Sequence, residues 1–178
     1  MNSQTRLVAT RLLALFLVIG ISVFVYSVRD QAAKLAVYGY PGIFVLSFLA
    51  YATVFLPAPG IAVVFTMGAL FNPFLVALSA GSGAALGELT GYLAGYSGQG
   101  LAERAKLYSK LEGWMRKNGP LTIFFLSAIP NPFFDLAGAS AGVLRMPALK
   151  FLLSCWLGEV VKMTFFSFAG SAVINRFL

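Results

Sequence analysis

No charged residue occurs between Lys34 and Glu88, a run of 53 positions in a chain of 178 residues. A run of this length can hold two hydrophobic passes of about 20 residues each. Charged residues make up only 11% of the chain, whereas a soluble domain of this size carries roughly 25%. So little charge cannot cover a water-soluble surface. The sequence therefore predicts an all-α integral membrane protein.

The composition argues against several function classes. The basic residues behind the net charge of +7 flank hydrophobic segments and form no nucleic-acid-binding motif, so the charge indicates topology and lipid contact. The chain has no histidine, and its single cysteine, Cys155, lies in an apolar segment that we expect to be helical. These features remove the usual zinc ligands and the commonest general base. We therefore expect no enzyme, metal site, cofactor or nucleic-acid partner.

The first 34 residues are predicted to contain an anchor helix. The apolar run 12–28 follows Arg6 and Arg11 and precedes Arg29. It is about 25 Å long at 1.5 Å per residue, so flanking residues must help it cross about 30 Å of hydrocarbon. The sequence that follows, VRDQAA, is a poor cleavage site, which favours a retained anchor over a signal peptide.

Residues 35–178 are predicted to form one membrane domain. Within it, the apolar segment LPAPGIAVVFTMGALFNPF (56–74) is interrupted by prolines and glycines. Each proline removes a helical hydrogen bond and clashes with the preceding turn, so we expect short helices joined by a break. We assign a hairpin turn to Pro57, Pro59 and Gly60.

Residues 74–97 resume as a predicted helix that is rich in glycine. A four-residue glycine spacing suits close contact between helices in a bilayer. The alternative is that a membrane helix merely tolerates these residues. The glycines are Gly81, Gly83, Gly87, Gly91 and Gly95.

The segment LAERAKLYSKLEGWMRKN (101–118) differs from its surroundings in charge. It has five basic and two acidic residues, and its apolar residues share one helical face, so we predict an amphipathic helix on the membrane surface. The positive-inside rule puts this helix and the N-terminus in the cytoplasm. A solvated connector is the alternative. The apolar face comprises Leu101, Leu107, Tyr108, Leu111, Trp114 and Met115.

A second broken element, 119–144, repeats the order of the first. In both copies a Pro-x-Pro is followed by Gly-[Ala/Val]-Leu-x-x-Pro and then by Leu-Gly-Glu. We interpret the pattern as a duplication, with repeat 1 at about 56–97 and repeat 2 at about 119–178; chance similarity is the alternative. The matched residues are Pro57 and Pro130, Gly68 and Gly142, Pro73 and Pro147, and Glu88 and Glu159.

The duplication predicts an inverted repeat of two re-entrant helical hairpins. Secondary transporters often combine two inverted repeats, each of which gives a broken helix to a site near the bilayer midplane. Irregular backbone at that depth persists only when it is buried in protein or lines a watery cavity. Each hairpin would turn at its Pro-x-Pro, the second at Pro130 and Pro132, and leave the membrane by the side it entered. A transmembrane helix with the Leu-Gly-Glu glutamate would follow.

Three acids lie in apolar segments, where a charge at the bilayer centre costs about 2.5–3.5 kcal/mol. Lys162 lies one helical turn after Glu159, so these two can form an ion pair, and a structural and a functional role both stay open. Glu88 has no base nearby in sequence, which favours a functional role. Asp135 can cap the second arm of its hairpin or border a phosphate site at that helix N-terminus. Arg145 can contact the same phosphate or extend to the interface.

From about Pro57 to Leu178 the chain resembles the DedA/VTT superfamily. The segment IPNPFFDLAGASAGVLRMP (129–147) is very similar to the P-N-P-x-F-D-x-x-G segment of the vacuole membrane protein branch. The segment LGELTGYLAGYSGQG (86–100) is similar to the family's LGD/E-x-x-x-Y-x-x-G segment. The resemblance implies two facing re-entrant hairpins and the movement or scrambling of membrane lipids. For bacterial members it implies recycling of undecaprenyl phosphate or phospholipids, driven by ion gradients.

Two departures favour the vacuole membrane protein branch over the bacterial type. Pro59-Gly60 is followed by Ile61, where bacterial members commonly carry an acid. The second turn has Asn131 and Pro132, where they commonly carry an arginine. The predicted substrate and ion pathway consists of Glu88, Asn131, Asp135, Arg145, Glu159 and Lys162.

Our leading hypothesis is a transporter or scramblase that moves phospholipid or polyprenyl-phosphate headgroups through a polar groove between the hairpins. The alternatives are an ion-coupled transporter of a small solute and a membrane scaffold without transport activity. The expected partners are membrane lipids together with protons or sodium ions, and a homo-oligomer is left open. We expect the chain in a bacterial-type plasma membrane, with its N-terminus in the cytoplasm.

Overall fold

A computed structural model describes residues 38–52, 57–97, 105–131 and 133–177. Every regular element in these ranges is an α-helix. The predicted anchor helix in residues 1–34 lies outside the described residues. The helices are α2 (Gly39–Ala52), α3 (Pro57–Leu70), α4 (Pro73–Tyr96), α5 (Ala105–Ala128), α6 (Phe134–Val143) and α7 (Ala148–Phe177).

Two of these helices are long and apolar enough to cross a membrane, namely α4 and the Ala148–Val173 part of α7. Helices α2 and α3 have 14 residues each and α6 has 10. At 1.5 Å per residue they are about 21 Å and about 15 Å long, which is less than the roughly 30 Å of a hydrocarbon core. Lengths of this kind suit hairpin arms that end inside the membrane.

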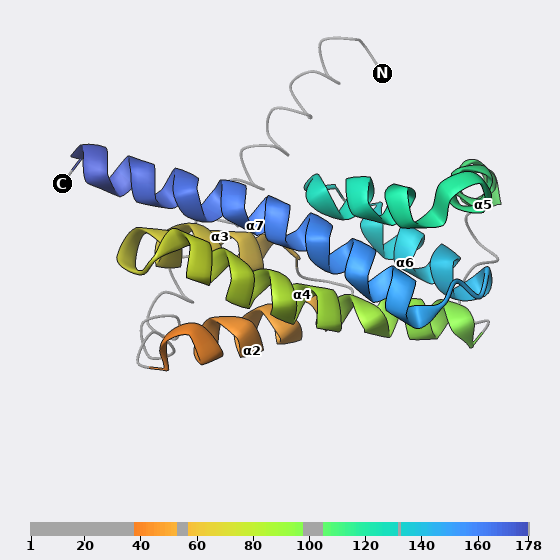
Figure 1. Ribbon diagram of the computed structural model, residues 1–178, viewed down its shortest axis with the longest axis horizontal. Helices are drawn as coiled ribbons and strands as arrows, with labels where there is room; N and C mark the ends of the chain where they lie inside the picture. The colour runs from red at the N-terminus through yellow and green to blue at the C-terminus, as the bar shows by residue number, and fades with distance from the viewer. Residues whose placement is uncertain (1–37, 53–56, 98–104, 132, 178) are drawn as a thin grey trace, which may run out of the picture.

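The long helices α4 and α7 lie side by side and run in opposite directions (Figure 1). Helices α2 and α3 form an antiparallel pair at the end of the molecule where α7 terminates. The second half of α5 and α6 form another such pair at the opposite end (Figure 1). Both pairs turn toward the middle of the molecule. The described helices thus form two antiparallel pairs at opposite ends of the molecule, one on each side of its middle.

The break between α3 and α4 has a local cause in the predicted Asn-Pro interruption. The Asn72 side-chain Oδ1 accepts hydrogen bonds from the backbone N–H of Phe74 at 3.1 Å and of Leu75 at 3.2 Å. Pro73 occupies the first helical position, where its missing N–H needs no partner. These two residues end one helix and start the next.

The amphipathic helix ends at a kink in α5. Asn118 has non-helical backbone angles, φ −156° and ψ 78°, and Pro120 opens the part that follows. The surface helix and the first arm of the second hairpin are therefore separate pieces, as the boundary at residue 118 predicted. Of its predicted apolar face, Leu111 and Met115 are buried, whereas Trp114 is 60% exposed. Trp114 therefore does not share the buried face, and Leu101 lies outside the described residues.

The predicted turn of the first hairpin was wrong in detail. Pro59 and Gly60 belong to the first turn of α3, which begins at Pro57. The first arm is α2, so this hairpin begins before residue 56. Proline in the first turn of a helix costs no hydrogen bond, so it marks a helix start as readily as a turn. In the second hairpin Pro130 does lie between the arms, while Pro132 lies outside the described residues.

Matched glycines of the two repeats make matched contacts. A Cβ on Gly68 of α3 would collide with the backbone of Ser167 on α7, and a Cβ on Gly142 of α6 would collide with the backbone of Tyr92 on α4. Each hairpin therefore rests its second arm against the long helix of the other repeat. Backbone contacts this close are available only to glycine.

The Leu-Gly-Glu glycines also pack against the backbone of another helix, in this case a helix of the same repeat. Gly87 packs against the backbone of α2 between Phe48 and Ala52, and Gly158 packs against α5 between Phe124 and Ala128. Each long helix thus holds the first arm of its own hairpin. Equivalent contacts at equivalent positions support the duplication that the sequence predicts.

Candidate functional site

The two Leu-Gly-Glu glutamates are buried near the crossing of α4 and α7. Gly81 of α4 packs directly against the backbone of Val160, so the two helices are in close contact there. Glu88 is 5% exposed on α4 and Glu159 is fully buried on α7. No hydrogen bond or ion pair joins Glu88 to another described residue. Carboxylates at this depth need a base, a proton or a polar ligand.

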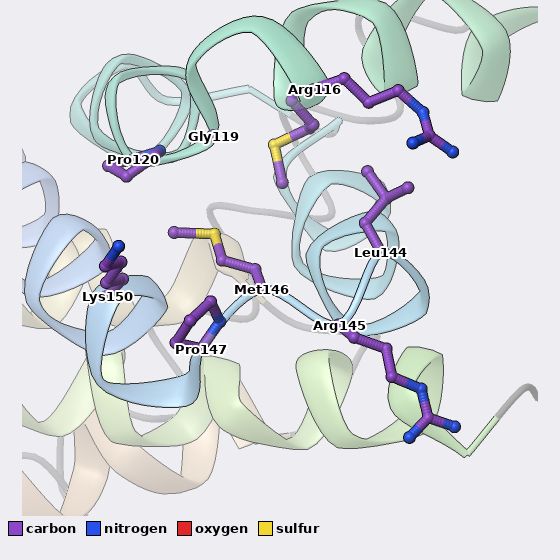
Figure 2. Close-up of a pocket in the computed structure, with 9 residues that line it drawn as sticks. Arg116, Gly119, Pro120, Leu144, Arg145, Met146, Pro147 and Lys150 are labelled. Atoms are coloured by element: carbon purple, nitrogen blue, oxygen red, sulfur yellow. The ribbon is translucent and has the colours of Figure 1, made fainter.

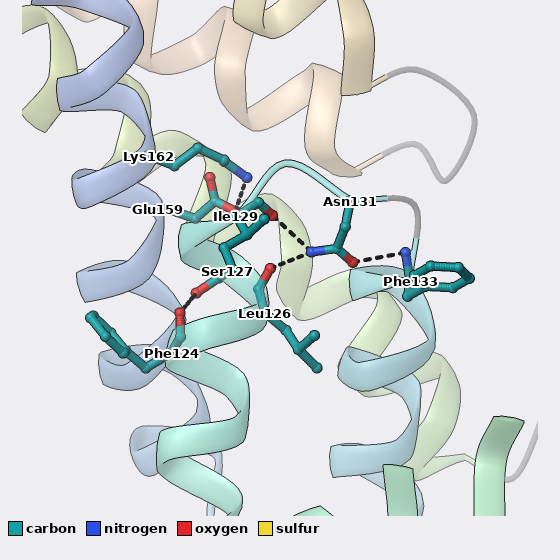
Figure 3. A network of polar contacts seen from close by, with 8 residues as sticks. All are labelled: Phe124, Leu126, Ser127, Ile129, Asn131, Phe133, Glu159 and Lys162. Atoms are coloured by element: carbon teal, nitrogen blue, oxygen red, sulfur yellow. Dashed lines mark hydrogen bonds and ion pairs between the residues drawn. The ribbon is translucent and has the colours of Figure 1, made fainter. Parts of the chain in front are cut away.

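Glu159 forms the ion pair predicted from its spacing. The Lys162 Nζ lies 2.6 Å from Glu159 Oε1, and both side chains are buried (Figure 3). The second carboxylate oxygen, Oε2, is buried without a hydrogen-bond partner in the described part of the chain. A buried ion pair carries a large desolvation cost. The unbonded Oε2 of Glu159 is therefore a candidate to bind a proton, a cation or another polar ligand.

Tyr51 of α2 brings the first hairpin to this pair. The Lys162 Nζ lies 5.1 Å from the centre of the Tyr51 ring, within the range of a cation–π contact. The Tyr51 hydroxyl is also buried and has no hydrogen-bond partner among the described residues. The sequence analysis missed this residue, because a tyrosine in an apolar run reads equally well as an interface aromatic.

Asp135 joins the same region from the second hairpin. Its backbone oxygen lies 4.0 Å from where a Cβ of Gly91 would be, one turn of α4 after Glu88. Glu88 interacts electrostatically with Glu159, Asp135 and Lys162. The N-cap position of α6 is Phe133, which provides no side-chain bond, and Asp135 lies in the first turn of the helix. The two roles predicted for Asp135, a cap and a site contact, both stay predictions. An acid there still interacts favourably with the helix dipole.

Four elements thus bring together three acids, one base and one tyrosine. We call this set the central cluster: Tyr51, Glu88, Asp135, Glu159 and Lys162. Fully ionised, its side chains carry three negative charges against one positive charge. Like charges in a medium of low dielectric constant cannot all be ionised without a large cost. The cluster can therefore hold a proton or another cation.

Comparison with known proteins agrees with this architecture. A family profile described as the VTT domain matches residues 56–172, about two thirds of the chain. The chain belongs to the VTT-domain family. It is therefore a membrane protein of the VTT/DedA type. The matched range starts one residue before α3, so α2 lies outside it although α2 contributes Tyr51.

One curated relative adds detail to the family assignment. The VTT-domain chain is 31% identical over 103 residues to the vacuole membrane protein KMS2 of Arabidopsis thaliana. The alignment covers 47% of this chain and 25% of that protein, so the chain spans about a quarter of its relative. No solved structure matches the chain significantly.

In this VTT domain Asn131 holds the turn of the second hairpin. Its Nδ2 donates to the carbonyls of Leu126 and Ile129, both at 2.7 Å, and its Oδ1 accepts from the Phe133 N–H at 2.9 Å (Figure 3). These three hydrogen bonds to backbone groups use both N–H donors of the amide and one of the two lone pairs of its oxygen. Asn131, predicted in the pathway, is thus committed to shaping the turn that positions Asp135.

Asn131→Asp is expected to destabilise this turn selectively. The carboxylate keeps the size and the acceptor but loses both donors, and it faces two backbone carbonyls instead. We expect the free energy of unfolding in detergent to fall by about 1–2 kcal/mol, because two hydrogen bonds of a partly buried side chain are lost. Denaturant titration measures the loss, with Asn118→Asp as the control, because there the side chain only accepts a bond, from the Leu121 N–H. Equal stability of the two variants would contradict this role.

Arg145 lies apart from the central cluster, contrary to the prediction that it shares the pathway with the acids. It follows the C-terminal end of α6, whereas Asp135 lies in the first turn. The length of α6 separates the two by about 15 Å. The Arg145 guanidinium donates to the Tyr96 hydroxyl at 3.1 Å and lies 4.6 Å from the centre of the Tyr96 ring.

Proposed function

We propose that this VTT-domain protein moves the headgroups of membrane lipids across the bilayer, as a transporter or scramblase. The observation that supports the proposal is that two helix pairs at opposite ends of the molecule (Figure 1) pack beside the buried Glu88, Glu159 and Lys162 of the long helices. Helices too short to span the membrane bring polar groups to mid-depth, where a headgroup meets its largest barrier. The acyl chains would stay in lipid while the headgroup passes.

Protons or sodium ions are the proposed coupling partners. A phosphate group would be repelled by three ionised acids with a single lysine. Protonation of Glu88 or Glu159, or binding of a cation beside them, would remove this repulsion. The lysine and the Tyr51 hydroxyl would then face the headgroup as donors. Transport in this scheme depends on the ion gradient.

Glu88→Gln tests the proposal directly. The full chain is reconstituted in liposomes with fluorescently labelled phospholipid or polyprenyl phosphate, and exposure of the label to an external quencher is followed with time. The wild-type protein is expected to raise the flip rate well above that of empty vesicles. Glu88→Gln keeps the shape but not the charge, and we expect it to lower the rate at least about tenfold, as loss of an essential proton site does.

Glu112→Gln is the matched control for this experiment. Glu112 is an acid paired with Arg116 on the amphipathic helix, away from the central cluster. Its substitution is expected to leave the flip rate within about twofold, because an exposed pair contributes little. Wild-type rates no higher than those of empty vesicles, for both lipids, would rule out the proposal.

An ion-coupled transporter of a small solute is the second candidate. It is favoured by the excess of acid over base in the central cluster, which suits a cation better than an anionic headgroup. The two candidates differ in liposomes. A solute transporter would show solute-dependent uptake of protons or sodium without any change in lipid flipping. We further propose a bacterial-type plasma membrane location with the amphipathic helix on the cytoplasmic side, from the charge of that helix.

A further inference from the structure

A separate cavity of about 400 Å³ lies at the end of the molecule where α5 kinks and α7 begins. This volume is within the range of small-molecule sites. Three cations line it, Arg116, Arg145 and Lys150. Figure 2 shows Arg116 and Arg145 on the side of Leu144, and Lys150 on the side of Pro120. The rest of the lining is mainly apolar, from Met115, Leu144, Met146 and Pro147.

Arg145 occupies its place at a conformational cost. Its φ of 52° is in the left-handed region that favours glycine. Its N–H bonds to the Gly142 carbonyl and the Met146 N–H bonds to the Ala141 carbonyl, both at 3.0 Å, which is the Schellman pattern that ends a helix. Glycine is the usual residue at this position because a side chain there is strained. A strained position occupied by arginine indicates a use for the guanidinium.

The exposed cations among the described side chains are Arg116, Lys117, Arg145 and Lys150; three of them line the cavity, and Lys117 follows Arg116 in the chain. Among the residues that the structure describes here, the acid is Glu112, and it already pairs with Arg116 at 2.8 Å. Tyr96 holds the Arg145 guanidinium with one bond, while a guanidinium has five donors. The cavity therefore keeps an excess of positive charge and unused donors at its rim.

The cavity lining distinguishes between two sources of an anionic phosphate. Inorganic phosphate would meet the cations but leave the methionine and leucine surfaces uncovered. The glycerol part of a phospholipid covers such surface while its phosphate meets the cations. The positive-inside rule also assigns this end to the leaflet that is rich in anionic lipid.

We infer that this cavity is a binding site for the headgroup of an anionic phospholipid in the leaflet at the α5–α7 end. The site is distinct from the central cluster and does not depend on transport. Lys150 and the two arginines at the rim, Arg145 and Arg116, supply the positive charge that attracts the phosphate and the anionic headgroup. The two methionines contact the glycerol region.

Calorimetric titration of the purified full chain in neutral detergent tests the site. The probes are short-chain phosphatidylglycerol, short-chain phosphatidylcholine and inorganic phosphate. Phosphatidylglycerol is expected to bind at least about tenfold more tightly than either of the others, since charged hydrogen bonds and apolar contact act together. Arg145→Gly and Lys150→Gln are each expected to weaken its binding about fivefold. Lys117→Gln, a neighbouring cation outside the cavity lining, is the matched control and should leave binding unchanged.

Arg145→Gly also separates binding from folding. Glycine relieves the left-handed strain, so we expect the melting temperature to stay or rise by about 2 °C while lipid affinity falls. If this variant fails to fold, Lys150→Gln still decides the question. Equal affinity for inorganic phosphate and phosphatidylglycerol would overturn the assignment to lipid. Unchanged phosphatidylglycerol affinity in Lys150→Gln would overturn the site itself.

Discussion

Glu159→Leu is expected to lower the free energy of unfolding by about 3–5 kcal/mol, because it leaves the Lys162 charge buried without its partner. Among the described residues, the Lys162 Nζ lies 2.6 Å from the Glu159 carboxylate and 5.1 Å from the centre of the Tyr51 ring. A cation–π contact of about 1–2 kcal/mol cannot replace a carboxylate in a desolvated position. Denaturant titration of the purified protein in detergent measures the loss.

The double variant Glu159→Leu/Lys162→Met is the control that separates charge from packing. Apolar residues of similar size often replace a buried pair without loss, so the double variant is expected within about 1 kcal/mol of wild type. If the ion pair has only a structural role, the double variant will be both stable and active. If the pair is also part of transport, the double variant will be stable but inactive in the liposome assay. Equal instability of the single and double variants would show that packing, not charge, limits the site.

Gly142→Val is expected to be the most damaging change in the second hairpin. The first carbon of any side chain there collides with the backbone of Tyr92 and Tyr96. Because both contacts are with backbone atoms, no side-chain rotation can relieve the collision. We expect a loss of about 3 kcal/mol or more, the upper end of overpacking costs. Gly68→Val on α3 should behave alike, because it meets the backbone of Ser167 on α7. Yield of folded protein and the unfolding midpoint are the measurements.

Gly113→Ala is the matched control for these glycines. Gly113 lies in the amphipathic part of α5 with no atom within 4 Å of a built Cβ. Alanine there should stabilise the protein by about 0.5–1 kcal/mol, because it removes the flexibility of glycine within a helix. If Gly142→Val folded as well as Gly113→Ala, the close contact of α6 with α4 would be wrong. If only one of Gly68→Val and Gly142→Val were harmful, the equivalence of the repeats would be wrong.

The repeat can be predicted from the sequence because close helix contacts require glycine at particular positions. Gly68, Gly142, Gly87 and Gly158 all occupy contacts that exclude a side chain, and a pattern of this kind survives in the sequence of both copies. The first hairpin was harder to delimit. Nothing within the uniformly apolar run before Pro57 marks α2 as an arm, and prolines start helices as well as interrupt them.

The members of the candidate site could be named only in part. Glu88, Asp135, Glu159 and Lys162 were predicted because charge in an apolar segment is conspicuous. Tyr51 was missed, since its ring is ordinary in such a segment and its role comes from the packing of α2 against α4, which brings the ring near Lys162.

Local spacing was enough to predict the membrane class, the helix breaks near Asn72 and Asn118, and the pairing of Glu159 with Lys162. Each of these depends on residues within a few positions of one another or on composition, which the chain carries before it folds. The convergence of four helices on one cluster, and the separation of Arg145 from Asp135, required the folded chain. Both depend on which end of a short helix faces the middle of the molecule, and that is set by packing between segments far apart in sequence.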